Sequence, residues 1–408
     1  MRKIGGSAAS NTLAIIVASL GYFVDVFDIW LYSSLRKSSL EGLGYTGTQV
    51  KSIGEMLLNF QMAGFMVGAI LFGIVADRKG RLTVLFSSIL TYSLANIANG
   101  FVHDVNLYAA CRFVAGVGLA GELGAGIALV SELVSKEKRG WATTFVATVG
   151  VFGSVAAPLV AKSFDWRTAY FIGGGMGLLL LLMRVGVLES GMFENVKDRD
   201  DVKRGDFRHL FETKDRRRRY LAIILAGVPV WYFAGALMTF NAEVQQALGI
   251  ANPAKLPDVI AIGALGLCFG DILFGALSQQ IKSRRKAFFA AYGWMILAIA
   301  ALFTLCKTGD AFYWTMFIGG LGAGYWAVFV TTSGEIFGTN LRGTVATTAP
   351  SFVRGIVIPI SICVHFFEPK IGYIATLSFI GAIVFAAAIW AVSIMPETFH
   401  HDMNFVEE

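Results

Sequence analysis

The stretch that decides the fold is Gly68–Arg81, GAILFGIVADRKGR. It reads as the end of an apolar helix, closed by Asp77 and followed by three basic side chains. Gly68 and Gly73 remove side-chain bulk from a face that otherwise carries Leu and Ile, so the backbone of another helix can come close to it. The stretch predicts a tightly packed apolar helix with a charged loop at its end. The alternative is an ordinary helix terminus with juxtamembrane basic residues.

The composition of the whole chain is that of a polytopic membrane protein. Of its 408 residues, 55% are hydrophobic and only 15% are charged, and the mean hydropathy is +0.63. Soluble domains carry roughly 25% charged residues, and several apolar runs here exceed the ~20 residues that cross a bilayer core. The net charge of +6 therefore indicates topology-setting basic residues rather than nucleic-acid binding.

Twelve membrane spans are predicted, so both termini lie on one side. On the side of the termini the segments hold 23 of the 34 Lys and Arg residues, the opposite loops hold 8, and 3 lie within spans. The excess of positive charge predicts that the termini are cytoplasmic. The predicted spans are 12–33, 51–76, 82–101, 106–134, 141–162, 167–188, 220–245, 257–280, 287–306, 311–337, 344–367 and 371–395.

One long polar connection, residues 190–219, divides the spans six and six. It predicts an N-terminal half at 1–189 and a C-terminal half with a short cytoplasmic tail at 220–408. We expect the connection to be a solvated cytoplasmic linker; binding of anionic lipid is the alternative.

The two halves repeat each other, which is typical of transporters with a central site between two halves. The second copy of the charged loop has Gln279 in place of the aspartate. The matching positions are Gly68 and Gly73 with Gly270 and Gly275, and Glu132, Arg139 and Gly140 with Glu335, Arg342 and Gly343.

These motifs resemble those of the major facilitator superfamily, in which the loop between the second and third helices reads G-x-x-x-D-R-x-G-R. The matching residues are Gly73, Asp77, Arg78, Gly80 and Arg81. The resemblance implies an all-α membrane protein with twelve transmembrane helices in two pseudo-symmetric six-helix halves. It also implies that this loop gates the cytoplasmic side, and we expect Glu132 and Arg139 to brace that gate.

Three segments resemble the metabolite and aromatic-acid proton symporters of this superfamily. They are residues 21–28 (GYFVDVFD), residues 112–132 (RFVAGVGLAGELGAGIALVSE), and the E-S and P-E-T pairs that close the halves. Val26 stands where the family has glycine, so the first match is partial. The resemblance implies a secondary active transporter that moves a small organic anion, such as a carboxylate, with protons by alternating access. The alternatives are a proton-driven exporter of drugs or siderophores, a carrier of a zwitterion or cation, and a transporter-like receptor that does not cycle.

Three carboxylates are candidates for proton coupling. Asp25 and Asp28 lie roughly 20 Å into the first span at 1.5 Å per residue, and their spacing of three places them on one helix face. Two carboxylates so close in a low dielectric do not both ionise readily, which suits a proton site; capping of a broken helix or permanent pairing with an arginine is the alternative. Glu122 is implicated in proton handling by the resemblance.

Two arginines inside spans are candidates for holding the substrate anion, because a guanidinium stays charged and its fork matches a carboxylate. Arg354 lies near the middle of the eleventh span, beside Gly355 and one turn before Pro359. Its alternative role is a buried pair with Asp271. Arg112 enters the fourth span and either pairs with the first-span aspartates or holds the substrate.

Five further side chains are predicted to line the cavity of the second half, although aromatic residues in membrane helices more often belong to the core or the interface. They are Trp231, Tyr232, Asn241, Tyr325 and Trp326. The chain has no phosphate-binding Gly-Lys-Thr loop, metal cluster or catalytic triad, which disfavours ATP-driven transport and enzyme activity. We expect no cofactor apart from protons as the coupling ion, no metal and no nucleic-acid partner. We expect a monomer in the plasma membrane, which is the inner membrane if the source is bacterial.

Overall fold

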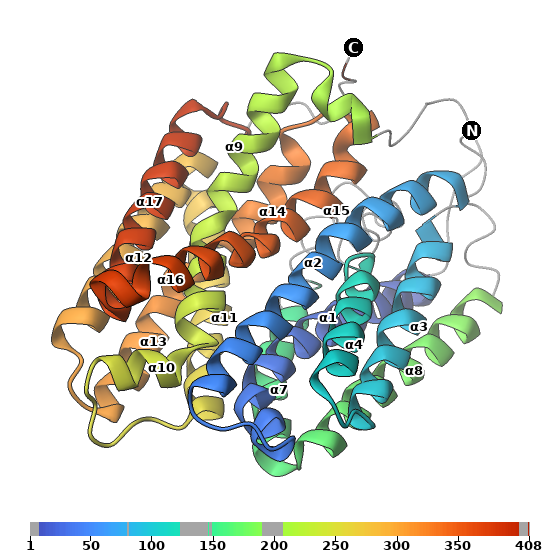
Figure 1. The fold of residues 1–408 in the computed structure, drawn as a ribbon. Coiled ribbons are helices and arrows are strands. Elements are labelled where there is room, and N and C mark those ends of the chain that lie inside the picture. The colour runs from blue at the N-terminus through green and yellow to red at the C-terminus, as the bar shows by residue number, and fades with distance from the viewer. Residues whose placement is uncertain are drawn as a thin grey trace, which may run out of the picture.

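The computed structural model describes residues 8–79, 81–122, 146, 149–189, 207–399 and 407. Within these ranges the ordered elements are all helices (Figure 1). Nine of the described helices are long and apolar enough to cross a membrane, and two shorter apolar helices, Val105–Leu119 and Val149–Ser163, accompany them. The predicted all-α membrane fold is confirmed.

The helices before the linker gather on one side of the molecule, and those after it on the other (Figure 1). The first group is α1 (Ala8–Gly42), α2 (Thr48–Lys79), α3 (Arg81–Gly100), α4 (Val105–Leu119), α7 (Gly153–Ser163) and α8 (Trp166–Glu189). The second group is η2 (Phe207–Phe211), α9 (Lys214–Trp231), η3 (Tyr232–Met238), α10 (Asn241–Ala247), α11 (Leu256–Ile281), α12 (Arg284–Leu305), α13 (Gly309–Ala323), α14 (Trp326–Glu335), α15 (Thr339–Gly355), α16 (Val357–Ile371) and α17 (Tyr373–Ile394). The groups meet where α1 and α7 pack on α11, and where α2 packs on α15 and α16.

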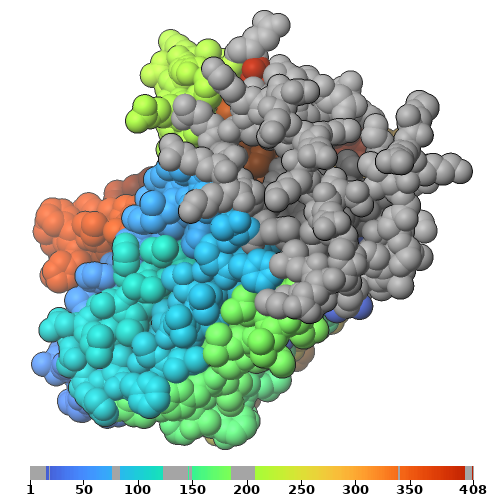
Figure 2. Space-filling view, turned by 90° about the vertical axis from the view of Figure 1, so that its right-hand side faces the viewer, coloured from blue at the N-terminus to red at the C-terminus, as the bar shows by residue number. Residues whose placement is uncertain are grey.

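The described surface is apolar and the interior carries charge, the reverse of a soluble protein. Figure 2 shows the face that includes α3, α4 and α8. On these helices Leu94 and Leu182 expose 53% and 69% of their surface, while Asp25 and Arg112 in the interior expose none. Ionisable groups within a bilayer face the bundle interior and pair with one another, and this arrangement places the chemistry of the protein inside.

Repeated glycines set the closest helix contacts in both groups. A Cβ atom on Gly68 would lie 2.4 Å from the Val117 carbonyl oxygen of α4, and one on Gly270 would lie 2.1 Å from the Leu321 carbonyl oxygen of α13. Only glycine permits this approach, so the prediction for Gly68 is confirmed. The predicted close helix contact at Gly73 is not found: among the described residues nothing lies within 4 Å of a Cβ placed there.

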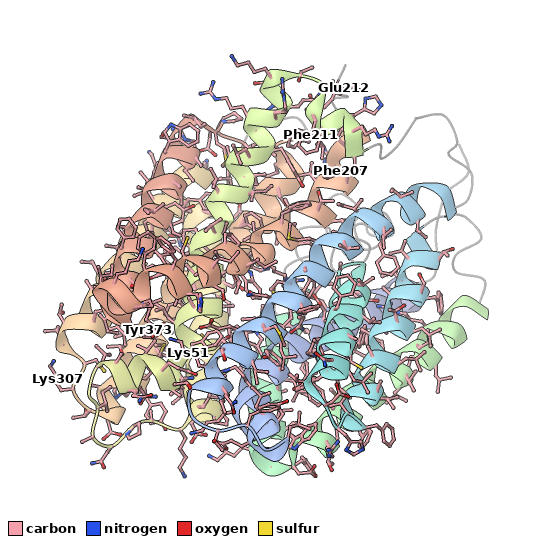
Figure 3. The ribbon with its side chains drawn as sticks, in the orientation of Figure 1. Lys51, Phe207, Phe211, Glu212, Lys307 and Tyr373 are labelled. Carbon is pink, nitrogen blue, oxygen red and sulfur yellow. The ribbon has the colours of Figure 1, made fainter. Side chains whose placement is uncertain are left out.

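The last part of the predicted linker, residues 207–219, contacts the second group of helices through a few side chains, while most of its residues are exposed. Phe207 stacks on Phe352 of α15 with ring centroids 6.2 Å apart, and Phe207 and Phe211 both meet Tyr220 of α9 edge-on. The Thr213 hydroxyl caps α9 by accepting from the Arg216 N–H. Aromatic packing and this cap therefore attach residues 207–219 to the second group of helices, at the end of the molecule where Figure 3 labels Phe207 and Phe211.

Three spans of the second group are interrupted near their middle. The seventh span passes from α9 into the π-helix η3, the tenth breaks between α13 and α14, and the eleventh breaks between α15 and α16. The last break has a direct cause: Pro359 has no N–H to donate to the carbonyl of Gly355. The breaks place Trp231, Trp326 and Arg354 at or next to the ends of helix segments. The side chains of Trp231 and Arg354 contact each other there.

Candidate functional site

An ion pair between the two groups of helices lies at the centre of the site. A guanidinium nitrogen (Nη2) of Arg354 in α15 lies 3.4 Å from the Oδ2 of Asp25 in α1. Both side chains are buried. The predicted alternative, a pair of Arg354 with Asp271, is not what forms; the acidic partner comes from the other half of the molecule.

This pair is incompletely satisfied. The Asp25 Oδ1 and the Arg354 Nε are buried and have no hydrogen-bond partner in the described part of the chain, and 3.4 Å is longer than usual for a charge-assisted hydrogen bond. A second carboxylate could offer Arg354 the bidentate contact that Asp25 does not make. The pair therefore leaves hydrogen-bonding capacity unused on both side chains.

Aromatic rings from both groups surround Arg354. Its guanidinium carbon lies 4.5 Å from the centre of the Phe65 ring and 5.9 Å from that of Trp231. Close by, the Trp326 indole N–H donates to the Tyr22 hydroxyl at 3.2 Å, which joins α14 to α1. The buried guanidinium of Arg354 thus lies beside aromatic rings from both groups of helices.

Asp28 belongs to a separate network formed within the first group of helices. It accepts hydrogen bonds from Asn96 and, at 3.3 Å, from Gln61, and it lies 3.6 Å from Arg112. Arg112 also donates to the Asn96 side-chain oxygen at 2.5 Å, and its guanidinium carbon lies 5.1 Å from the centre of the Tyr170 ring. The two aspartates were expected to act as a close pair. Instead, Asp25 pairs with Arg354 of the second group of helices, and Asp28 pairs with Arg112 of the first group.

Glu122 forms the tightest ion pair of the first group. Its two oxygens accept from Arg184 at 3.0 and 2.8 Å, and Ser88 donates to it at 2.7 Å. A Cβ on Gly21 of α1 would lie 2.3 Å from the Arg184 guanidinium. With its acceptors occupied by a bidentate partner, Glu122 braces α1, α3 and α8, and its predicted role in proton handling remains a prediction.

Three of the predicted cavity residues have hydroxyl or amide groups that bond to backbone within the second group. The Tyr232 and Tyr325 hydroxyls donate to the carbonyls of Leu377 and Ala226, at 2.6 and 2.9 Å. The Asn241 amide donates to the Met238 carbonyl at 2.8 Å. The structure brings only Trp231 and Trp326 of the five into the surroundings of Arg354 and Tyr22.

The predicted cytoplasmic gate lies mostly outside the described residues. This applies to Gly80, Glu132 and Arg139, and to the side chains of Asp77, Arg78 and Arg81. The second copy is described: Arg284 donates to both oxygens of Glu335 at 2.9 and 3.2 Å, and its backbone N–H donates to Glu397 at 2.8 Å. Burial alone would raise the pKa of Glu397, but hydrogen bonds from Ser283 and the Arg284 backbone outweigh it and lower the pKa.

Three ion pairs join the two groups at the end opposite the linker. They are Arg36–Glu243 at 2.8 Å, Lys51–Glu368 at 2.5 Å and Lys162–Asp258 at 2.8 Å. Figure 3 labels Lys51 at this end and Phe207 at the other. The three pairs connect α1 to α10, α2 to α16 and α7 to α11, so the described conformation is closed at this end.

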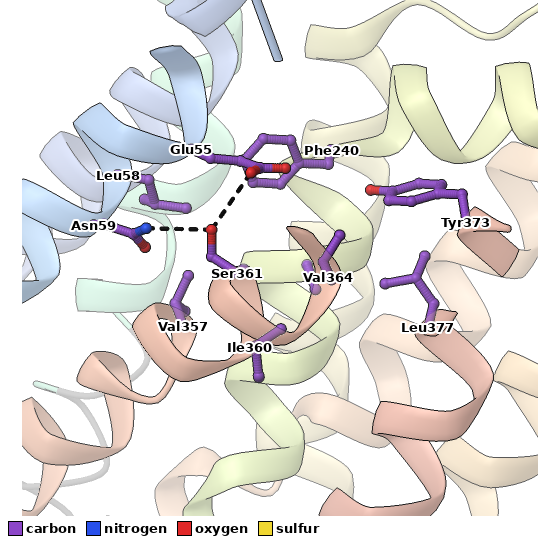
Figure 4. Close-up of a pocket in the computed structure, with 12 residues that line it drawn as sticks. Glu55, Leu58, Asn59, Phe240, Val357, Ile360, Ser361, Val364, Tyr373 and Leu377 are labelled. Carbon is purple, nitrogen blue, oxygen red and sulfur yellow. Dashed lines mark hydrogen bonds between the residues drawn. The ribbon is translucent and has the colours of Figure 1, made fainter. Parts of the chain in front are cut away.

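A pocket with about 320 Å³ of empty space lies between the groups near this closed end (Figure 4). Ser361 of α16 bridges two α2 side chains there: it donates to Glu55 at 3.5 Å and accepts from Asn59 at 3.2 Å. Val357 and Tyr373 also line it, but Asp25 and Arg354 do not. The central ion pair is therefore not part of the lining of this pocket.

Several residues of these networks were not predicted. Arg184 carried the clearest signal, because an arginine inside an apolar span requires a partner. Asn96 and Gln61 had the weaker signal of an amide in an apolar helix. Phe65 had none, since a phenylalanine at that position fits any membrane helix.

Comparison with known proteins agrees with the all-helical membrane fold described above. The family model described as Major Facilitator Superfamily matches residues 18–362. A protein named "Probable 4-methylmuconolactone transporter" from Cupriavidus pinatubonensis is 25% identical over 93% of this chain and 89% of its own length. The cis,cis-muconate transport protein of Acinetobacter baylyi is 25% identical, over 96% and 95%. The gentisate transporter of Corynebacterium glutamicum is 23% identical, over 83% and 77%.

Proposed function

Because this chain belongs to the Major Facilitator Superfamily and is a multi-pass membrane transporter rather than an enzyme, we propose that it imports a small unsaturated or aromatic carboxylate together with protons. The observation that carries the proposal is the Asp25–Arg354 pair, which lies between the two groups of helices and is incompletely satisfied.

In this mechanism Asp25 and the substrate compete for one guanidinium. While Asp25 is ionised it neutralises Arg354, and an incoming anion gains little. Protonation of Asp25 removes its charge and leaves Arg354 as an unpaired buried cation, which costs several kcal/mol. The carboxylate of the substrate relieves that cost with a bidentate contact. Proton and anion therefore bind together, and the neutralised site can pass between the two sides by rocking of the halves.

The energetics favour this coupling. An anion that enters a cell with a negative interior works against about 2.3 kcal/mol per charge per 100 mV. One proton carried with a monocarboxylate removes that electrical work, so the pH gradient alone can drive accumulation. No further cofactor is needed.

The aromatic surroundings of Arg354 support a planar substrate. The rings of Phe65 and Trp231 lie 4.5 and 5.9 Å from the guanidinium carbon of Arg354, and Arg112 already contacts Asp28 and Asn96. The names of three relatives refer to compounds of this class: muconate, gentisate and a methylmuconolactone. We place the protein in the plasma membrane, with both termini and the linker cytoplasmic, on the strength of the basic-residue asymmetry.

The test is uptake by purified protein in liposomes with an imposed pH gradient, acidic outside. The panel comprises radiolabelled benzoate, gentisate, cis,cis-muconate, a siderophore and a cationic drug. We expect accumulation of one of the acids. Asp25→Asn should reduce it strongly but still exchange internal for external substrate, because exchange needs no net proton movement. Accumulation of the siderophore or the drug alone, or undiminished acid accumulation by Asp25→Asn, would refute the proposal.

A further inference from the structure

Asp271 of α11 is a partly buried residue with one buried carboxylate oxygen, and the mechanism above does not use it. We propose that Asp271 carries a second proton in each transport cycle, so that two protons enter with one monocarboxylate. The inference rests on the proposed proton-coupled uptake and adds its stoichiometry and a second proton-carrying residue.

The two oxygens of Asp271 have different surroundings. Oδ1 accepts the backbone N–H of Ala327 at 2.8 Å, at the start of α14. Oδ2 is buried and has no hydrogen-bond partner among the described residues. In the described part of the chain no lysine or arginine forms an ion pair with this carboxylate, whereas Asp25, Asp28 and Glu122 each have an arginine. A proton on Oδ2 would neutralise Asp271 without breaking the bond that Oδ1 makes.

The location of Asp271 suits a proton carrier. It lies 15 residues into a helix of 26, about 22 Å from the start of α11 at 1.5 Å per residue, and so between the two ends of the span. Ionisable residues at such depth are expensive and mark ion or proton pathways. The N-terminus of α14 favours the ionised form of Asp271 through its helix dipole, while burial favours the protonated form. Small movements of α14 can therefore shift the equilibrium between these two forms.

A hydrogen bond links this balance to the movement of the two halves. Trp326, the first residue of α14, donates to the Tyr22 hydroxyl of α1. The cap at Ala327 therefore lies one residue from a contact between the halves. When the halves rock, this contact and the start of α14 must change together, and with them the proton affinity of Asp271.

Few titratable groups compete with Asp271 for this role. The elements that pack on α11 are α1, α7, α10, α12, α13, α14 and η3. Among the described residues of these elements and of α11 itself, the phenol of Tyr22 and the thiol of Cys268 interact electrostatically with Asp271. Tyr22 also interacts electrostatically with Asp25 and Arg354.

Charge balance gives the proposal a sharp test. One anion with two protons carries one net positive charge inward, whereas one anion with one proton carries none. With a fixed pH gradient, we would impose −100 mV inside liposomes by a potassium gradient and valinomycin. We would then measure accumulation of radiolabelled benzoate or gentisate, the monocarboxylates of the panel, whichever is transported faster. The wild type is expected to accumulate on the order of 50-fold more acid with the potential than without it.

Asp271→Asn is expected to lose this response to potential and to keep accumulation driven by the pH gradient, because the asparagine oxygen can still accept from Ala327. Asp310→Asn, an exposed carboxylate in the first turn of α13, is the matched control and should respond like the wild type. If accumulation by the wild type does not change with the potential, the inference is overturned without any variant. It is also overturned if accumulation by Asp271→Asn rises with the potential as much as that of the wild type. Failure of the wild type to accumulate any acid would instead refute the proposed function.

Discussion

Arg354 and Arg112 are both buried arginines paired with an aspartate of the first span, but their surroundings give them different roles. Arg354 has an incompletely satisfied partner from the other half and aromatic rings around it. Arg112 is held by Asp28 and Asn96 within the first group of helices. We therefore expect that Arg354 binds the substrate and that Arg112 stabilises the fold.

Arg354→Lys should weaken acid binding by about 1.5–3 kcal/mol, since lysine keeps the charge but loses the bidentate fork. Arg354→Ala should weaken it further. Binding is measured by thermal shift with a transported acid and with its amide. The loss should be confined to the acid, because the amide has no charge for Arg354 to hold; equal losses for both would mean that Arg354 supports the helix instead.

Arg112→Ala should act on stability instead. It leaves Asp28 as a buried charge without its cation, a change worth about 3–5 kcal/mol for a broken buried pair. We expect a lower thermal midpoint for the purified protein, and recovery of most of that loss when Asp28→Asn is added, since the double variant has no unpaired charge. A stable Arg112→Ala protein with weakened acid binding would transfer the substrate role to Arg112.

Helix α11 shows how a repeated glycine sets the distance between two elements. Gly270 lies against the Leu321 carbonyl of α13, whereas the described residues leave open space at Gly275 on the same helix. Gly270→Ala should therefore push α11 away from α13 and lower the thermal midpoint by several degrees. Gly275→Ala is the matched control and should not lower it, because alanine favours the helix over glycine. Equal effects of the two substitutions would show that helix propensity rather than close packing matters here.

The whole molecule is held closed at one end by three ion pairs between its halves. Arg36 is buried and its guanidinium makes two 2.8 Å contacts with Glu243, so this pair should contribute most. Glu243→Gln should shift the protein toward the conformation open at that end. The reporter is Ser33→Cys in a background without the four native cysteines, because the Ser33 hydroxyl contacts that of Thr239 between the halves. With Glu243→Gln added, this cysteine should react several-fold faster with an impermeant maleimide added outside than it does without that substitution.

The matched control for this experiment is Glu41→Gln. Glu41 pairs with Lys37 on the same helix, both side chains are exposed, and their atoms lie 3.8 Å apart. Because that pair does not join the halves, its loss should leave the labelling rate unchanged. Faster labelling in both variants would mean that surface charge, rather than closure of the halves, controls access.

The sequence by itself determined the membrane class, the all-helical fold and the superfamily. These depend on apolar runs, glycine spacing and a charged loop, all of which are local or periodic along the chain. It also determined that Asp25, Asp28, Arg112 and Arg354 are buried, because a charged residue within an apolar span faces the interior of the helix bundle. The break beside Arg354 followed from Pro359 for the same local reason.

Only the tertiary structure decided how those charges pair. Asp25 and Asp28 are one helical turn apart, yet Asp25 meets Arg354 from 329 positions along the chain and Asp28 meets Arg112. The direction in which each side chain points depends on which helices pack beside α1. The same holds for Glu122 with Arg184 and for the cap that Asp271 places on α14. Pairing across helices is a property of packing, and neither spacing nor composition along the chain specifies it.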